Sequence, residues 1–142
     1  IMLTDKIFTP DESTSINCPF FMSAVEAGFP SPAEDYIEGS LDLNKHLIKH
    51  PAATFFVRVS GDSMINAGIY PGDILIVDRS LEATDKKIVI AVIDGELTVK
   101  RLRHRDNLLF LDPENEAYTP IQITKEMAFE VWGVVTNVVH KV

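Results

Sequence analysis

The spacing of hydrophobic residues changes near residue 40. Beyond residue 53, short apolar and β-branched runs recur roughly every ten residues, with turn residues between them. No long run of apolar residues at helical spacing interrupts this pattern. We therefore expect a mostly β domain over residues 41–142.

Several of these runs can be assigned to strands. The expected strands cover residues 54–59, 73–78, 88–93, 96–102, 108–111 and 129–139. Residues 88–93 are apolar on both faces, which predicts a central strand. Asp94-Gly95 follows that strand and is typical of a two-residue hairpin turn, while Pro71-Gly72 indicates a turn before the strand at 73–78.

The first 40 residues have no sustained period. They hold four of the eight prolines and a polar stretch at residues 11–15, so we expect a flexible N-terminal arm over residues 1–40. Ser40 is expected to cap one short helix that ends before Pro51. The apolar residues of this helix are Leu43, Leu47 and Ile48.

Length, charge and cysteine content limit the class of protein and the cellular compartment that the sequence allows. The 142 residues are 46% hydrophobic, enough for one domain with a buried core and an additional arm. The net charge of −8 predicts a surface that repels phosphate, so strong direct DNA binding is not expected. A single cysteine, Cys18, excludes an internal disulfide.

No apolar run approaches the roughly 18–20 residues of a membrane span. Since Asp5 also stands where a signal peptide would be apolar, a cytoplasmic protein is expected.

Ser63 is the first candidate for chemistry. It lies in Ser60-Gly61-Asp62-Ser63-Met64, directly after the strand that ends at Val59. Glycine permits a tight turn, which can expose a hydroxyl beside free backbone N–H groups. Such groups can hold the oxyanion that forms when a serine attacks an amide. The alternative is a turn serine that caps its own backbone.

Lys100 is the second candidate. It lies inside an expected strand, on the same side as Thr98 and Leu102. A lysine that faces a core or a cleft loses hydration, which lowers its pKa, and only a neutral amine can take a proton from serine. The alternative is an exposed strand lysine, and the sequence does not show whether Lys100 contacts Ser63.

The third feature is Ala27-Gly28 in the arm. A peptide bond that enters a narrow cleft needs an extended segment with small residues at its centre, and these two residues are small. The alternative is an ordinary loop alanine and glycine.

Together these features resemble the self-cleaving serine–lysine peptidases of the LexA and UmuD family. The resemblance is carried by Ala27-Gly28, Ser60-Gly61-Asp62-Ser63-Met64 and Glu96-Leu97-Thr98-Val99-Lys100. The stretches that resemble the UmuD branch are residues 28–33, 42–44, 72–78 and 129–139. Residues 1–18 do not match, and Ala27 is closer to the cleavage site of the repressors than to the cysteine often found in UmuD.

The resemblance implies a compact β domain of short, strongly twisted strands, and it assigns roles to residues. Ser63 would be the nucleophile, and Lys100 the general base that later protonates the leaving amine of Gly28. The backbone amides of Asp62, Ser63 and Met64 would form the oxyanion hole. No cofactor and no metal are implied.

The resemblance also implies partners. In this family the RecA filament on single-stranded DNA stimulates slow self-cleavage as part of the SOS response. The trimmed chain, as a homodimer, then serves a UmuC-type Y-family polymerase in error-prone translesion synthesis.

Three other functions compete with this hypothesis. They are the catalytic fragment of a LexA-like repressor, a membrane-anchored signal peptidase, and an interaction module with a vestigial dyad. A repressor needs a helix-turn-helix module of roughly 60 residues before the cleaved bond. Only 27 residues precede Gly28 here, so the polymerase subunit is the favoured hypothesis.

The sequence favours structural roles, and not metal binding or catalysis, for the four histidines. His46 and His50 have a spacing that can hold zinc on a helix, but no motif supplies further ligands, so a solvated helix face is expected. His104 and His140 stand alone at strand ends and are expected at the surface.

The sequence also favours structural roles for the remaining polar and aromatic candidates. Cys18 has no nearby cation to form a thiolate, and Asp62 is expected to be a turn residue. Trp132 is expected in the core or at a dimer contact. The basic cluster at residues 100–105 is expected to be a solvated hairpin face.

Overall fold

The computed structural model describes residues 7–21, 27–28 and 37–142. The chain divides into two compact units. The larger unit comprises Ile1–Pro10 and His50–Val142, and the smaller unit comprises Asp11–Lys49.

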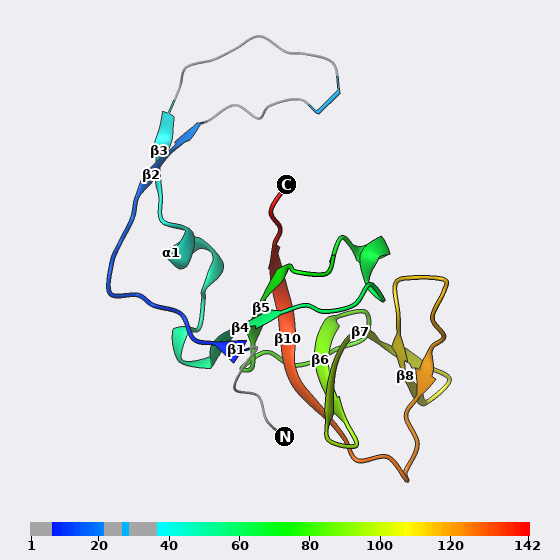
Figure 1. Cartoon of the computed structure of the whole chain (residues 1–142). Helices are drawn as coiled ribbons and strands as arrows, with labels where there is room; N and C mark the ends of the chain where they lie inside the picture. Colours follow the sequence, from blue (N-terminus) through cyan, green and yellow to red (C-terminus); the bar gives the residue numbers. More distant parts are fainter. Residues whose placement is uncertain (1–6, 22–26, 29–36) are drawn as a thin grey trace. The chain divides into compact units, whose positions relative to one another are not determined.

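The larger unit is built on one antiparallel sheet, which confirms the mostly β prediction (Figure 1). Its spatial order is β1-β4-β5-β10-β6-β7-β8-β9. The strands are β1 (Ile7–Phe8), β4 (Thr54–Arg58), β5 (Ile74–Asp78), β6 (Ile88–Ile93), β7 (Glu96–Arg105), β8 (Leu108–Asp112), β9 (Ile121–Gln122) and β10 (Phe129–Val139). Every strand expected from the sequence is present.

The local turn chemistry explains two of the hairpins. Asp94 and Gly95 both have positive φ, 49° and 86°, which is the conformation of a type I′ turn between β6 and β7. A second turn of the same kind, at Asp106 and Asn107, joins β7 to β8 and was not predicted. The predicted turn at Pro71-Gly72 is confirmed, with Gly72 at φ 92°.

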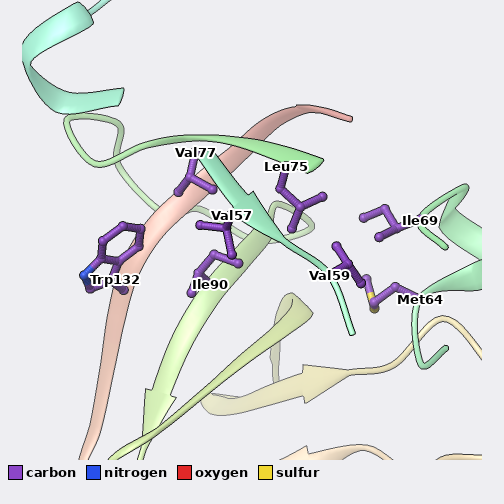
Figure 2. Close-up of a cluster of buried hydrophobic side chains, with 8 residues drawn as sticks. All are labelled: Val57, Val59, Met64, Ile69, Leu75, Val77, Ile90 and Trp132. Carbon is purple, nitrogen blue, oxygen red and sulfur yellow. The ribbon is translucent and has the colours of Figure 1, made fainter. Parts of the chain in front are cut away.

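Two clusters of buried side chains pack on opposite faces of β6. Ile90 belongs to the first cluster, whereas Val89 and Ala91 belong to the second. This alternation confirms that residues 88–93 form a central strand buried on both faces. The first cluster also holds Trp132, which places this residue in the core (Figure 2).

The smaller unit has more regular structure than the sequence predicts. Strand β2 (Cys18–Phe21) pairs with β3 (Ile37–Leu41), and α1 (Leu43–Leu47) follows. The prediction that Ser40 caps the helix is wrong, because Ser40 is still extended and paired within β3. Asp42 is the cap, since its Oδ1 accepts a hydrogen bond from the backbone N–H of Asn44 at 3.0 Å.

Part of the expected arm lies outside the described residues. This applies to residues 1–6, 22–26 and 29–36, and therefore to most of the stretch at 28–33 that resembles UmuD. In the described part of the chain, no helix is long and apolar enough to cross a membrane.

Two of the histidine predictions are wrong in part, because both side chains are exposed as expected but each contacts a buried carboxylate. His50 lies beyond the end of α1, and its Nδ1 is 2.6 Å from Oδ2 of the buried Asp78. His140 does not stand alone, because its Nδ1 is 2.6 Å from Oδ1 of the buried Asp73. Burial alone would raise the pKa of Asp73, but hydrogen bonds from His140 and from the backbone N–H of Tyr70 outweigh it and lower that pKa. Both histidines thus help to hold the ends of β5.

Candidate active site

The turn that follows β4 presents Ser63. Gly61 has a φ of 83°, a left-handed conformation that favours glycine. Met64 and Ile69, on the far side of Ser63, are each 1% exposed and anchor the segment in the first core cluster (Figure 2). Ser63 itself is only half-buried, so the core fixes the turn while the serine stays partly accessible.

Strand β7 supplies Lys100, which pairs with Val89 of β6 in the sheet. The Lys100 Nζ atom lies 2.9 Å from Ser63 Oγ, although the two residues are 37 positions apart in the chain. Nζ is also 2.9 Å from Thr98 Oγ1 and 3.1 Å from the carbonyl oxygen of Val99. Alternation along β7 places Thr98 on the same side as Lys100, as the sequence predicts.

The surroundings of Lys100 favour its neutral form. The residue is half-buried, and no carboxylate of the described residues lies within 4.0 Å of its Nζ. Burial therefore lowers the pKa of Lys100 below its usual range. The neutral amine can donate its two N–H groups to Thr98 Oγ1 and the Val99 carbonyl, which leaves its lone pair for the Ser63 hydroxyl.

Three backbone N–H groups at the Ser63 turn have no acceptor in the described part of the chain. Among the residues that the structure describes, none accepts a hydrogen bond from the N–H of Asp62, Ser63 or Met64. The Ser63 carbonyl, in contrast, accepts from the N–H of Glu114 at 2.8 Å. The three amides are therefore free to bind an external oxygen.

Asp62 is held away from this chemistry. Its carboxylate accepts a hydrogen bond from the hydroxyl of Tyr118, and its carbonyl accepts one from Asn115 Nδ2 at 2.9 Å. Asp62 is exposed, as expected for a turn residue.

The basic cluster on β7 is ion-paired rather than simply solvated. Arg101 Nε lies 2.5 Å from Glu114, Arg103 Nε lies 3.3 Å from Asp85, and Arg105 Nη2 lies 2.9 Å from Asp112. The expectation of a solvated hairpin face is therefore wrong for the arginines. Three carboxylates neutralise the cluster, which weakens it as a phosphate-binding surface.

Ala27 and Gly28 belong to the smaller unit. Both are exposed and form a bend, and a Cβ atom added to Gly28 would meet nothing within 4 Å. Both residues therefore carry little side-chain bulk at exposed positions.

Sequence reasoning missed the residues that surround the turn. Thr98 was placed beside Lys100 by alternation, but its contact with Nζ was not expected. Glu114, Asn115 and Tyr118 gave no signal, because their contacts with the Ser63 turn span about fifty residues and depend on the sheet topology.

Comparisons with known proteins fit this geometry. Residues 19–136 match the family described as Peptidase S24-like. Protein SamA of Salmonella typhimurium is 47% identical over 132 residues, which cover 93% of this chain and 89% of SamA. Protein MucA of Escherichia coli is 43% identical over 130 residues, which cover 84% of this chain and 82% of MucA. The LexA repressor of Shewanella denitrificans is 38% identical over 118 residues, which cover 83% of this chain but 57% of the repressor.

Proposed function

Because this chain belongs to the Peptidase S24-like family, we propose that it is a serine peptidase that cuts its own chain between Ala27 and Gly28. The observation that carries the proposal is the 2.9 Å contact between Lys100 Nζ and Ser63 Oγ, in a place where burial lowers the pKa of the lysine. A nucleophile within hydrogen-bond reach of a base is the arrangement that covalent catalysis requires.

The proposed mechanism uses Ser63 and Lys100 in two steps. The neutral Lys100 amine takes the Ser63 proton as Oγ attacks the carbonyl carbon of Ala27. The free amides of Asp62, Ser63 and Met64 bind the resulting oxyanion. The Lys100 ammonium then gives its proton to the amine of Gly28, which leaves, and Ala27 stays as an ester on Ser63. Water, deprotonated by Lys100, hydrolyses this ester and restores Ser63.

Cleavage within the same chain, or within a dimer, needs no free substrate. The arm is tethered, so its concentration near Ser63 is set by the chain and not by diffusion. Under these conditions a partly buried lysine is a sufficient base, even where proton transfer from serine to the lysine is slow. The same tether explains how a partner could control the reaction by favouring the docked arm, through a shift of population.

We infer that the trimmed chain, residues 28–142, serves an error-prone polymerase. The inference rests on the resemblance to UmuD and on the similarity to SamA and MucA over most of their lengths. The implied partners are a second copy of the chain, the RecA filament on single-stranded DNA and a UmuC-type polymerase, acting in the cytoplasm during the SOS response. Strand β10 pairs with β5 on one edge and β6 on the other, so the dimer contact would not add a strand to β10.

The alternative is the catalytic part of a LexA-like repressor. The similarity to a LexA repressor covers 57% of that protein, whereas the similarity to SamA covers 89% of SamA at higher identity. The higher identity to SamA, 47% against 38% for the repressor, favours the polymerase subunit. Both functions use the same self-cleavage, so the site does not distinguish them.

The proposal is tested by incubating the purified chain at mildly alkaline pH and following it by mass spectrometry. We expect a fragment that begins at Gly28, with no such product from Ser63→Ala or Lys100→Ala. His104→Ala is a matched control, because this residue is exposed on the same strand as Lys100 and makes no contact with Ser63. An intact wild-type chain after long incubation, or equal cleavage of Ser63→Ala, would contradict the proposal.

A further inference from the structure

The segment between β8 and β9 contacts the nucleophile turn through its backbone. The N–H of Glu114 donates to the Ser63 carbonyl at 2.8 Å. The carbonyl of Glu114 accepts from the N–H of Asn66, also at 2.8 Å. One residue of this segment therefore holds the turn on both sides of Met64, with two hydrogen bonds of good length.

Side chains of the same segment hold the other end of the turn. Asn115 Nδ2 donates to the Asp62 carbonyl at 2.9 Å, and the Tyr118 hydroxyl donates to the Asp62 carboxylate. Asn115 Oδ1 also accepts from the N–H of Ala117 at 3.0 Å, which folds the segment on itself. The contacts thus bracket Ser63, with Asp62 on one side and Asn66 on the other.

A further contact joins this segment to the strand that carries the base. Arg101, the neighbour of Lys100, donates from Nε to Glu114 Oε1 at 2.5 Å. The two side chains are 27% and 29% exposed, so water screens this pair less than a fully exposed one. Arg101 is itself fixed, because its Nη1 donates to the Lys86 carbonyl at 2.7 Å. Lys100 is thus linked to Ser63 through its chain neighbour Arg101, the Arg101–Glu114 ion pair and the Glu114 backbone N–H.

We propose that residues 113–118 position Ser63 for attack by bracketing its turn and tying that turn to the strand of Lys100. The inference rests on the proposed function and identifies Glu114 and Asn115 as positioning residues. Within residues 7–21, 27–28 and 37–142, the turn at residues 60–63 pairs with no strand. Without these contacts, the distance between Ser63 Oγ and Lys100 Nζ would vary, and a displacement of about 1 Å can reduce a rate by roughly a hundredfold.

The experiment compares self-cleavage rates and local hydrogen exchange in four variants. Asn115→Ala removes the bond to Asp62, and Glu114→Ala removes the tie to Arg101. Glu114→Gln keeps an oxygen that can accept from Arg101 Nε. Arg105→Ala removes an ion pair of the same kind between β7 and β8, with Asp112, that does not reach the Ser63 turn.

We expect Asn115→Ala and Glu114→Ala to lower the first-order cleavage rate by about tenfold or more. Backbone exchange over residues 60–66 should rise in the same two variants. Glu114→Gln should stay close to the wild-type rate, and Arg105→Ala should cut at the wild-type rate even if its thermal midpoint falls. If Glu114→Ala does not fold, Asn115→Ala decides, because it removes only the two side-chain hydrogen bonds of a half-buried loop residue, to Asp62 and from Ala117.

Wild-type rates in Asn115→Ala and Glu114→Ala would overturn the inference and leave the proposed function intact. Slowing without faster exchange at residues 60–66 would also overturn it, because the turn would then be as well held as in the wild type. Equal slowing in Arg105→Ala would overturn it too, since that result indicates a general loss of stability. Absence of cleavage in the wild-type chain would instead overturn the proposed function, and this inference with it.

Discussion

Lys100 has three polar contacts, but a neutral amine has only two N–H groups to donate. The Val99 carbonyl can only accept, and Thr98 Oγ1 can accept as well, so both N–H groups have partners other than Ser63. In a neutral amine, the remaining lone pair would then accept from the Ser63 hydroxyl, whose Oγ lies 2.9 Å from Nζ. At the residue scale, Thr98 and the backbone of Val99 would therefore orient Lys100, the proposed base, while burial favours its neutral form.

The first prediction at this scale concerns pH. Burial lowers the pKa of Lys100, so the neutral amine becomes populated at lower pH than for a free lysine. We expect the self-cleavage rate to rise with pH through this lowered pKa and to level off below the usual lysine value of about 10.4. First-order rates across a pH series would measure the midpoint. A rise centred on the usual lysine value, or a rate that falls with pH, would contradict the role of Lys100.

A second prediction concerns Thr98→Val, which keeps the shape of the side chain and removes the acceptor. We expect the plateau rate at alkaline pH to fall by about tenfold, because the amine is free to turn away from Ser63. The midpoint should also move to slightly lower pH, since the charged form of Lys100 loses a hydrogen bond. Thr98→Ser restores the hydroxyl and should recover most of both effects. Unchanged kinetics in Thr98→Val would exclude Thr98 as a positioning residue.

At the scale of elements, local chemistry could predict strands but not their order. Asp94-Gly95 predicts its hairpin because only a few residue types adopt positive φ at both positions. The insertion of β10 between β5 and β6 depends on contacts that are far apart in the chain, which no local pattern encodes. Ser63 and Lys100 were identified by residue type and resemblance, but their contact follows from this long-range pairing. The Glu114 contacts could not be predicted for the same reason.

Gly133 provides a prediction about β10. The register of β10 against β6 shifts between Val131 and Gly133, and a Cβ atom at Gly133 would lie 2.6 Å from Val77 Cγ1. Val77 is fully buried and cannot move aside without disturbing the first core cluster. We expect Gly133→Ala to lower the free energy of unfolding by about 1–3 kcal/mol, as overpacking does.

Thermal or urea unfolding would measure this loss. Gly39→Ala is the matched control, because Gly39 also lies in a strand but a Cβ atom there would meet nothing within 4 Å. Similar unfolding midpoints for the two variants would mean that the chain near Gly133 relaxes, and that the close approach to Val77 does not determine the stability of β10.

At the scale of the whole molecule, the proposed cleavage would cut the covalent link to two strands. Strand β1 pairs with β4 through Ile7 and Phe8 only, and β2 pairs with β3. Both β1 and β2 precede the bond between Ala27 and Gly28, whereas β3 and β4 follow it. After cleavage, the described contacts within each unit would hold residues 1–27 through these two short pairings and two side-chain hydrogen bonds, from Ser15 Oγ to Asp42 Oδ2 and from Asn44 Nδ2 to the Asp11 carbonyl. The β2–β3 pair is a two-stranded sheet, and such sheets are marginal in water.

We therefore expect residues 1–27 to dissociate once the chain is cut. Their loss would remove Ile7 from its contact with the first core cluster and expose the edge of β4. Partial burial of one isoleucine contributes about 1 kcal/mol, so the thermal midpoint of the cut chain should fall by roughly 2–5 °C.

The uncut reference is Ser63→Ala. Size-exclusion chromatography with mass spectrometry would separate the fragments, and hydrogen exchange would rise at Phe56 and Val57, the residues that β1 covers. Co-elution of the two fragments with an unchanged midpoint would show that cleavage leaves the sheet edge closed, and any new partner of the trimmed chain would then have to bind elsewhere.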